Sequence, residues 1–236
     1  DFTSDEIRLI FQGVIFLVLS ICVHEYGHAI VADKLGDRLP RSQGRTTLNP
    51  LAHADPIGTL AFPLISLVIT HGASIGFGWG KPVMVNPNSF TRKLQMRVAH
   101  MLVAAAGPAM NILLGIIITV AHLVATKQGW LAEVKPGTPW STGHQAFMAA
   151  GMLNFGLAIF NCIPAPPLDG GAILEGLLPH KYVAKYQEIS VYGPFVLMAV
   201  IMIEPLRNAL GYLAYSAYYY WSSLIGLAQV LRLGAP

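Results

Sequence analysis

Charged residues are scarce in this chain of 236 residues. Asp, Glu, Lys and Arg together make up 11% of it, whereas 54% of the residues are hydrophobic. An ordinary soluble domain carries about 25% charged residues, so this supply is too small to cover a water-exposed surface. The mean hydropathy of +0.54 points the same way. The shortage excludes a disordered chain and favours a protein that spans a lipid bilayer.

Cysteine and net charge are also low. Cys22 and Cys162 both lie in apolar stretches, which argues against a disulfide framework and leaves the compartment open. The net charge of +3 is small and scattered, so we expect no nucleic-acid partner. We also expect no cleavable signal peptide, because the first apolar run follows an acidic segment and continues too long.

Six apolar runs are candidates for membrane segments. A span needs about 20 predominantly apolar residues. The second and fifth runs are shorter than this, so tilted or incomplete crossings are open for both. The runs cover residues 7–35, 58–75, 98–126, 144–163, 190–203 and 206–231.

The basic residues indicate how many of these runs cross, because cytoplasmic loops collect Lys and Arg. If all six runs cross, the 15 basic residues divide seven to eight between the two sides. If the run 58–75 enters and leaves on the same side, they divide eleven to four. Pro63 and His71 interrupt this run, as irregular backbone at membrane depth would allow. We therefore favour five spans and a re-entrant segment over 58–75.

The predicted fold class is an all-α polytopic membrane protein that forms a single domain over residues 1–236. It has about five to six transmembrane helices and a re-entrant segment. Residues 36–97 form a cytoplasmic-face insertion that contains this segment. Val-rich and Thr-rich stretches in the insertion predict small β-hairpin elements at the cytoplasmic face, with short strands at 45–48 and 83–85.

The first apolar run contains a metal-binding pattern. His24, Glu25 and His28 form H-E-x-x-H. Residues four apart lie on one face of a helix, so both imidazoles can reach one zinc ion, while Glu25 lies about 100° away and can contact its water. Each ionisable residue inside a span costs roughly 2.5 to 3.5 kcal/mol on insertion scales. Three of them within five positions therefore indicate a function.

A catalytic zinc site needs a third protein ligand, and Asp169 is the preferred candidate. It lies in the segment 161–171, where three prolines end a helix and two glycines permit a tight turn. We interpret Asp33 and Asp37 as residues of a solvated helix end, and Asp55 as a turn or cap residue. With five spans, the first and third spans run parallel and bring the three ligands to the cytoplasmic side.

The chain resembles the site-2 proteases, the zinc metalloproteases of peptidase family M50 that cut within the membrane. The resemblance lies in three ordered motifs: residues 24–28, Gly107-Pro108 and residues 161–171, which read N-x-x-P-x-x-x-L-D-G-G. It implies one Zn²⁺ per chain with His24, His28 and Asp169 as ligands, and Glu25 as general base. It also implies Asn161 as a polar group near the reacting carbonyl. The chain is similar to the short branch, with no room for a PDZ or CBS domain.

Other polar residues in the apolar runs carry more than one interpretation. Asn161 can stabilise a developing oxyanion, or hydrogen-bond a neighbouring helix. We expect Asn111 and Asn154 to form interhelical hydrogen bonds. His71 is interpreted as a packing residue, with a role as a cap of the cavity as the alternative. The remaining histidines are expected at the membrane interface, namely His53, His100, His122, His144 and His180.

The expected function is zinc-dependent intramembrane endoproteolysis. The enzyme would hydrolyse a peptide bond in or near a transmembrane helix of a membrane-anchored protein substrate. The alternative is a metal-binding membrane transport or scaffold protein without proteolytic activity, since broken helices and ionisable residues at the midplane also mark transporters. Glu25 and the absence of repeated halves count against it. The expected location is a bacterial-type cell membrane, as an integral multi-pass protein with the active site towards the cytoplasmic side. The sequence leaves the oligomeric state open.

Overall fold

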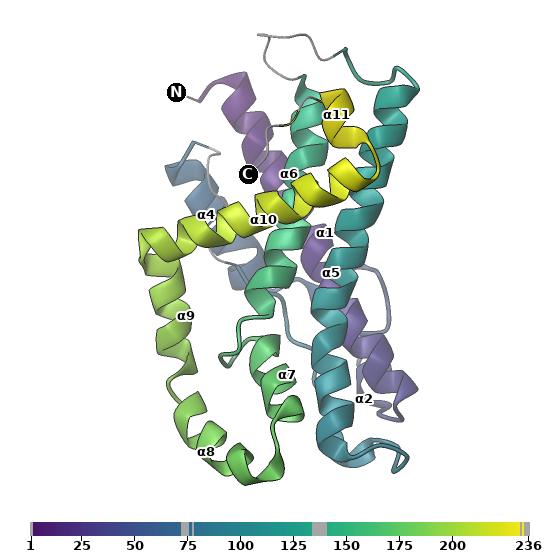
Figure 1. The fold of residues 1–236 in the computed structure, drawn as a ribbon, viewed down its shortest axis with the longest axis vertical. Coiled ribbons are helices and arrows are strands. Elements are labelled where there is room, and N and C mark those ends of the chain that lie inside the picture. The colour runs from purple at the N-terminus through teal and green to yellow at the C-terminus, as the bar shows by residue number, and fades with distance from the viewer. Residues whose placement is uncertain (1, 72–75, 77, 134–140, 232, 234–236) are drawn as a thin grey trace.

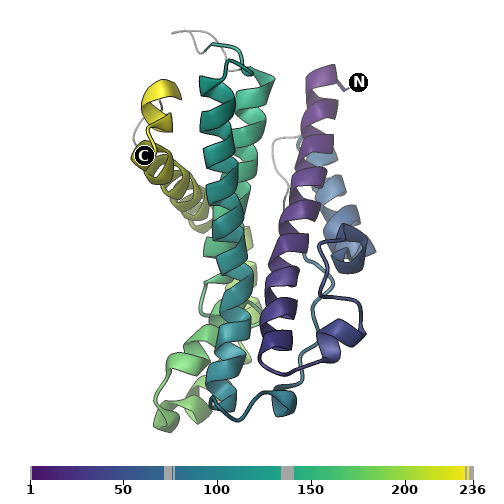
Figure 2. The same cartoon turned by 90° about the vertical axis from the view of Figure 1, so that its right-hand side faces the viewer.

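The computed structural model describes the whole chain except residues 1, 72–75, 77, 134–140, 232 and 234–236. The long helices over residues 4–34, 96–127 and 142–161 run along the long axis of the molecule, whereas the helix over residues 204–224 crosses them (Figures 1 and 2). The elements in chain order are α1 Ser4–Lys34, α2 Leu39–Ser42, α3 Pro50–His53, η1 Pro56–Ala61, α4 Phe62–Ile69, η2 Pro87–Ser89, α5 Met96–Lys127, α6 Thr142–Asn161, α7 Asp169–Leu177, α8 His180–Ser190, α9 Gly193–Met202, α10 Glu204–Leu224 and α11 Leu227–Leu231.

Helix α1 begins at a capping box and packs along α5. The Thr3 hydroxyl accepts a hydrogen bond from the Glu6 N–H at 3.2 Å, and the Glu6 carboxylate accepts one from the Thr3 N–H at 2.7 Å. Further along α1, Gly27 faces α5 so closely that a Cβ atom there would meet the backbone carbonyl of Ala106. A small residue at this crossing lets the two backbones approach, as in other membrane helix pairs.

The expectation of five to six transmembrane helices is wrong. Among the described residues, α1 and α5 are long and apolar enough to cross a membrane. Helices α9 and α10 are long and apolar enough for a span only when taken as a pair, and they are bent by 83° at their junction. The bend lies at Ile203, where Pro205 starts a new helix instead of continuing α9. Helix α6 has 20 residues, but its polar side chains make its mean hydropathy too low for a candidate membrane span.

The expected strands at 45–48 and 83–85 are also wrong, because no strand occurs in the described residues. The backbone groups of both segments have other partners. The Arg45 N–H donates to the Pro40 carbonyl at 2.8 Å, and the Arg45 guanidinium donates to the carbonyl of Ala52. The Val83 N–H donates to the Glu25 carboxylate at 3.1 Å. These bonds hold extended segments against the helices without a sheet.

The short helices η1 and α4 position the segment that follows them next to α1. Asp55 caps η1 by accepting hydrogen bonds from the N–H groups of Ile57 and Gly58. The Trp79 N–H donates to the Gly58 carbonyl at 3.1 Å, and the Thr59 hydroxyl donates to the Trp79 carbonyl at 2.7 Å. Residues 72–75 of the predicted re-entrant segment lie outside the described residues. Re-entry into a membrane therefore stays a prediction.

Candidate metal centre

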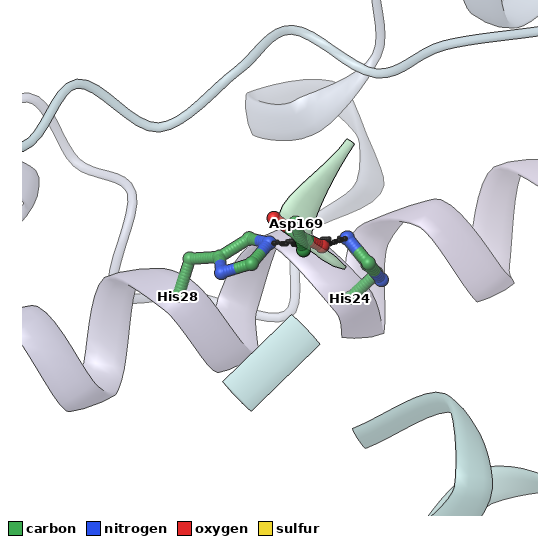
Figure 3. A group of neighbouring side chains, drawn as sticks. All are labelled: His24, His28 and Asp169. Atoms are coloured by element: carbon green, nitrogen blue, oxygen red, sulfur yellow. Dashed lines mark hydrogen bonds and ion pairs between the residues drawn. The ribbon is translucent and has the colours of Figure 1, made fainter. Parts of the chain in front are cut away.

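Three potential metal ligands point toward one another (Figure 3). The Nε2 atoms of His24 and His28 are 3.0 Å apart. Asp169 Oδ2 lies 3.1 Å from the first and 3.4 Å from the second. The ligand atoms of the group all lie within 4.8 Å of one another. The structure thus brings together the three residues that the sequence analysis selected as ligands.

Two separate elements supply these side chains. His24 and His28 are one turn apart on α1, whereas Asp169 is the first residue of α7. Gly170 and Gly171 allow α7 to begin there, because Cβ atoms at these positions would meet the backbone of Cys162 and Ile163 or the ring of Pro166. The two glycines therefore let the carboxylate approach α1 closely.

Hydrogen bonds that both imidazoles donate to α5 fix their tautomer. His28 Nδ1 lies 2.8 Å from the Val103 carbonyl oxygen, and His24 Nδ1 lies 2.6 Å from Asn111 Oδ1. Both oxygens can only accept, so each Nδ1 carries the proton and each Nε2 presents its lone pair to the centre. A bound metal requires neutral imidazoles in this orientation.

The Asn111 amide is itself held by two acceptors. Its Nδ2 donates to the Ser20 carbonyl at 3.2 Å and to Asn154 Oδ1 at 3.0 Å, and Asn154 in turn donates to the Ala150 carbonyl. This confirms the interhelical hydrogen bonds expected of Asn111 and Asn154. The contact between Asn111 and His24 was missed, because it depends on how α5 is rotated against α1.

The arrangement fits a divalent cation. Asp169 Oδ2 is buried and makes no hydrogen bond, although two imidazole nitrogens are close to it. Three lone-pair donors at this spacing repel one another unless a metal cation or a shared proton lies between them. Burial raises the pKa of Asp169, but His24 and His28 lower it to about 2 when their imidazoles are protonated, so the carboxylate is ionised and can bind a cation. Two imidazoles and one carboxylate are a donor set typical of catalytic zinc.

Gly107 leaves room for the two imidazoles. A Cβ atom at this position would meet the imidazole Nε2 atoms of both His24 and His28. The sequence analysis noted Gly107 only as part of a motif with Pro108. The structure shows that any larger side chain would displace the nitrogens that face the candidate metal position.

Glu25 and Asn161 line the same large cavity as the three ligands. Glu25 is oriented by the Val83 N–H, which donates to its Oε2. Asn161 donates from Nδ2 to the Leu157 carbonyl at 2.9 Å, within its own helix. The cavity has a volume of about 1760 Å³, and its mostly apolar wall includes residues of α1, α5, α6, α9 and α10.

Three histidines that were expected at the membrane interface are buried instead. His53, His122 and His144 are each 0% exposed. His122 Nε2 lies 2.8 Å from His144 Nδ1, and its Nδ1 lies 2.9 Å from the Tyr218 hydroxyl. The spacing of His122 and His144 in the sequence gave no sign of these contacts, because the residues involved lie on α5, α6 and α10.

Comparisons with known proteins agree with this site. Peptidase family M50 matches residues 12–146 and 128–201. The protein named putative zinc metalloprotease YwhC of Bacillus subtilis is 37% identical over 196 residues, which are 83% of this chain and 81% of that protein. The one named putative zinc metalloprotease Rip2 of Mycolicibacterium smegmatis is 30% identical over 87% of this chain and 74% of its own length. No solved structure gives a significant match.

The family match and the two long apolar helices identify a membrane metalloprotease. The chain belongs to peptidase family M50, which confirms its resemblance to the site-2 proteases. It is a zinc-dependent intramembrane protease, and its environment is the membrane. This membership does not favour the alternative of a transport or scaffold protein.

Replacing Gly107 by Ala should impair zinc binding while α5 remains helical. The added methyl group would push both imidazoles away from the centre. Zinc content after dialysis against a weak chelator measures the effect. Gly211→Ala is the matched control, because a Cβ atom at Gly211 meets nothing within 4 Å. Equal zinc retention by both variants would contradict the proposed ligand geometry.

Replacing Asn111 by Ala should lower zinc affinity about 10- to 100-fold, the usual effect of losing a hydrogen-bond partner of a ligand histidine. Asn111→Asp should recover part of the loss, because a carboxylate still accepts from His24 Nδ1. Competition with a fluorescent zinc chelator measures both variants. An Asp variant as weak as the Ala variant would show that the orientation of His24 is not the cause.

Proposed function

We propose that this chain is an endopeptidase that uses one zinc ion per chain, held by His24, His28 and Asp169, to hydrolyse a membrane-anchored protein. The bond cut would lie in or near a transmembrane helix of that protein. The observation that carries the proposal is the convergence of three ligand atoms in a cavity that also contains Glu25. The coarser assignment to zinc proteases rests on the family alone.

Zinc in such a site lowers the pKa of coordinated water to about 7 and polarises the carbonyl of the scissile bond. Glu25 is the general base in this proposal. It takes a proton from the attacking water and then delivers it to the leaving amine as a general acid. The hydrogen bond from the Val83 N–H orients the carboxylate. One oxygen is thereby fixed while the other can exchange the proton.

Asn161 is proposed to stabilise the oxyanion that develops on the substrate carbonyl. Its side chain reaches the same cavity as Glu25. A primary amide has two N–H donors, and the bond to the Leu157 carbonyl uses one of them. The second can donate to a negatively charged oxygen in the cavity, where the surroundings are largely apolar and such a bond is strong.

We place the site towards the cytoplasmic side of a cell membrane that the chain crosses more than once as a single domain over residues 1–236. Eight basic residues lie between residues 34 and 97, where α1 ends and α5 begins. Cytoplasmic loops carry an excess of Lys and Arg, which supports placing this end of α1 and α5 in the cytoplasm. His24 and His28 lie in the last third of α1, nearer to that end.

Replacing Glu25 by Gln should abolish proteolysis but leave zinc in place. General bases contribute about 10²- to 10⁴-fold to rate, and Gln cannot take a proton. Cleavage of a membrane-anchored substrate in liposomes, followed on gels, measures activity, and elemental analysis measures zinc. Glu188→Gln, at an exposed position of α8, is the control. Full cleavage by the Glu25 variant would rule out the mechanism.

Replacing Asp169 by Ala should weaken zinc binding more than the loss of Asn111 does, since a direct ligand is removed. Equilibrium dialysis against buffered zinc measures the affinity. Asp5→Ala removes an exposed carboxylate at the start of α1 and should not change the affinity. If the Asp169 variant holds zinc as tightly as the parent protein, the third ligand lies elsewhere.

A further inference from the structure

A second, smaller pocket lies where α5 begins, beside α7 and α8. Both views place the start of α5 and the α7–α8 segment at the same end of the molecule (Figures 1 and 2). The pocket has a volume of about 440 Å³, and His100 and Ala172 line both it and the large cavity. The zinc ligands do not line it. Its wall consists of Pro87, Gln95, Met96, Arg97, His100, Ala172, Glu175 and His180.

Arg97 is the unusual residue of this pocket. Its Nε and Nη1 atoms are both buried, and neither has a hydrogen-bond partner among the described residues. A guanidinium cannot lose its charge in a protein, so it cannot avoid the cost of burial by becoming neutral. Buried polar groups are nearly always hydrogen-bonded, and each exception calls for a specific partner. The pocket beside Arg97 provides space for one.

The surroundings of Arg97 favour a negatively charged partner. Arg97 lies in the first turn of α5, and the side chain of the N-cap residue Gln95 makes no capping bond. The N-terminus of this helix of 32 residues adds a partial positive charge to that of Arg97. The imidazoles of His100 and His180 contribute further donors at the pocket wall.

Glu175 is the carboxylate of the pocket wall, and it does not neutralise Arg97. Among the described residues, no ion pair joins Glu175 to Arg97. Glu175 Oε1 instead accepts a hydrogen bond from Gln187 Nε2 at 2.8 Å. Its negative charge lies in the pocket and should oppose an anion there. We therefore expect Arg97 to strengthen anion binding and Glu175 to weaken it.

We propose that this pocket binds a phosphate group, carried by a lipid headgroup or by a free phosphate. The arginine fork and the imidazoles match the several oxygens of a phosphate, and phosphate favours the N-terminus of a helix. The neighbouring Arg92 and Lys93 are exposed and raise the local positive potential. The inference uses none of the catalytic residues, so it holds whether or not the proposed peptidase mechanism is correct.

Native mass spectrometry of the purified, zinc-loaded protein in detergent tests the proposal. The probes are phosphatidylglycerol, phosphatidylcholine and inorganic phosphate. Retention of phosphatidylglycerol that inorganic phosphate does not displace would assign the site to a lipid headgroup. Displacement by phosphate at micromolar concentration would assign it to a free phosphate. If no probe is retained by the parent protein, the proposal is overturned.

Variants then locate the binding at Arg97. Arg97→Gln should weaken retention of the bound probe about 10- to 100-fold, as expected when charge-assisted hydrogen bonds are lost. Arg92→Gln removes the same charge from an exposed position, where solvent screens it, and should weaken retention far less than Arg97→Gln. Glu175→Gln should tighten binding, while its amide oxygen still accepts from Gln187. Equal retention by the parent, Arg97 and Glu175 proteins overturns the proposal.

Two control measurements on the same samples check that each variant is folded. Zinc content and the thermal unfolding temperature should match the parent protein in every variant. If Arg97→Gln fails to fold, Arg97→Lys replaces it, because lysine keeps the charge but loses the fork and should give intermediate retention. The proposal is also contradicted if Arg97→Lys retains the probe as well as the parent protein does and Glu175→Gln binds it no more tightly.

Discussion

The close packing of α5 against α1 determines the geometry of the metal centre. Gly27 brings the two backbones together, and Gly107 leaves space for the imidazoles at the same crossing. Two hydrogen bonds to α5 then fix the outer nitrogens of His24 and His28. The inner nitrogens therefore have one orientation, and their position relative to Asp169 follows from it. A shift of either helix would disturb both ligands together.

Asp169 completes the centre from a different element. The carboxylate is buried beside α1 without a hydrogen bond of its own, so a cation is the partner that compensates for its burial. The apolar wall of the large cavity strengthens the electrostatic interactions at this point. A membrane protein with few charges thus places a carboxylate and two imidazoles where a metal makes their burial favourable.

The candidate metal ligands could be predicted from the sequence, because local rules specify them. An i, i+4 spacing places His24 and His28 on one face of any helix, and the proline-rich and glycine-rich segment before α7 identifies Asp169. Asn111 could not be assigned to His24 in this way. Its role depends on the rotation of one helix against another, which no spacing within α5 contains.

The predictions for the membrane segments and strands were wrong for physical reasons. Apolar composition separates the runs 190–203 and 206–231, but it does not show that the helices formed there, α9 and α10, meet at an angle of 83° and are long enough for a span only as a pair. Likewise, the pattern around Val83 is typical of a strand, but the side chain of Glu25 takes the hydrogen bond that a ladder would need. A local proline accounts for the bend, whereas a long-range contact accounts for the missing strand.

The central claim is that His24, His28 and Asp169 bind zinc directly. X-ray absorption spectroscopy at the zinc edge of the purified protein tests this without reference to any substrate. The account predicts two imidazole nitrogens at about 2.0–2.1 Å with the remaining ligands oxygen, and one imidazole fewer in a His28→Ala protein. Sulfur at about 2.3 Å, or an unchanged spectrum in that variant, would contradict it.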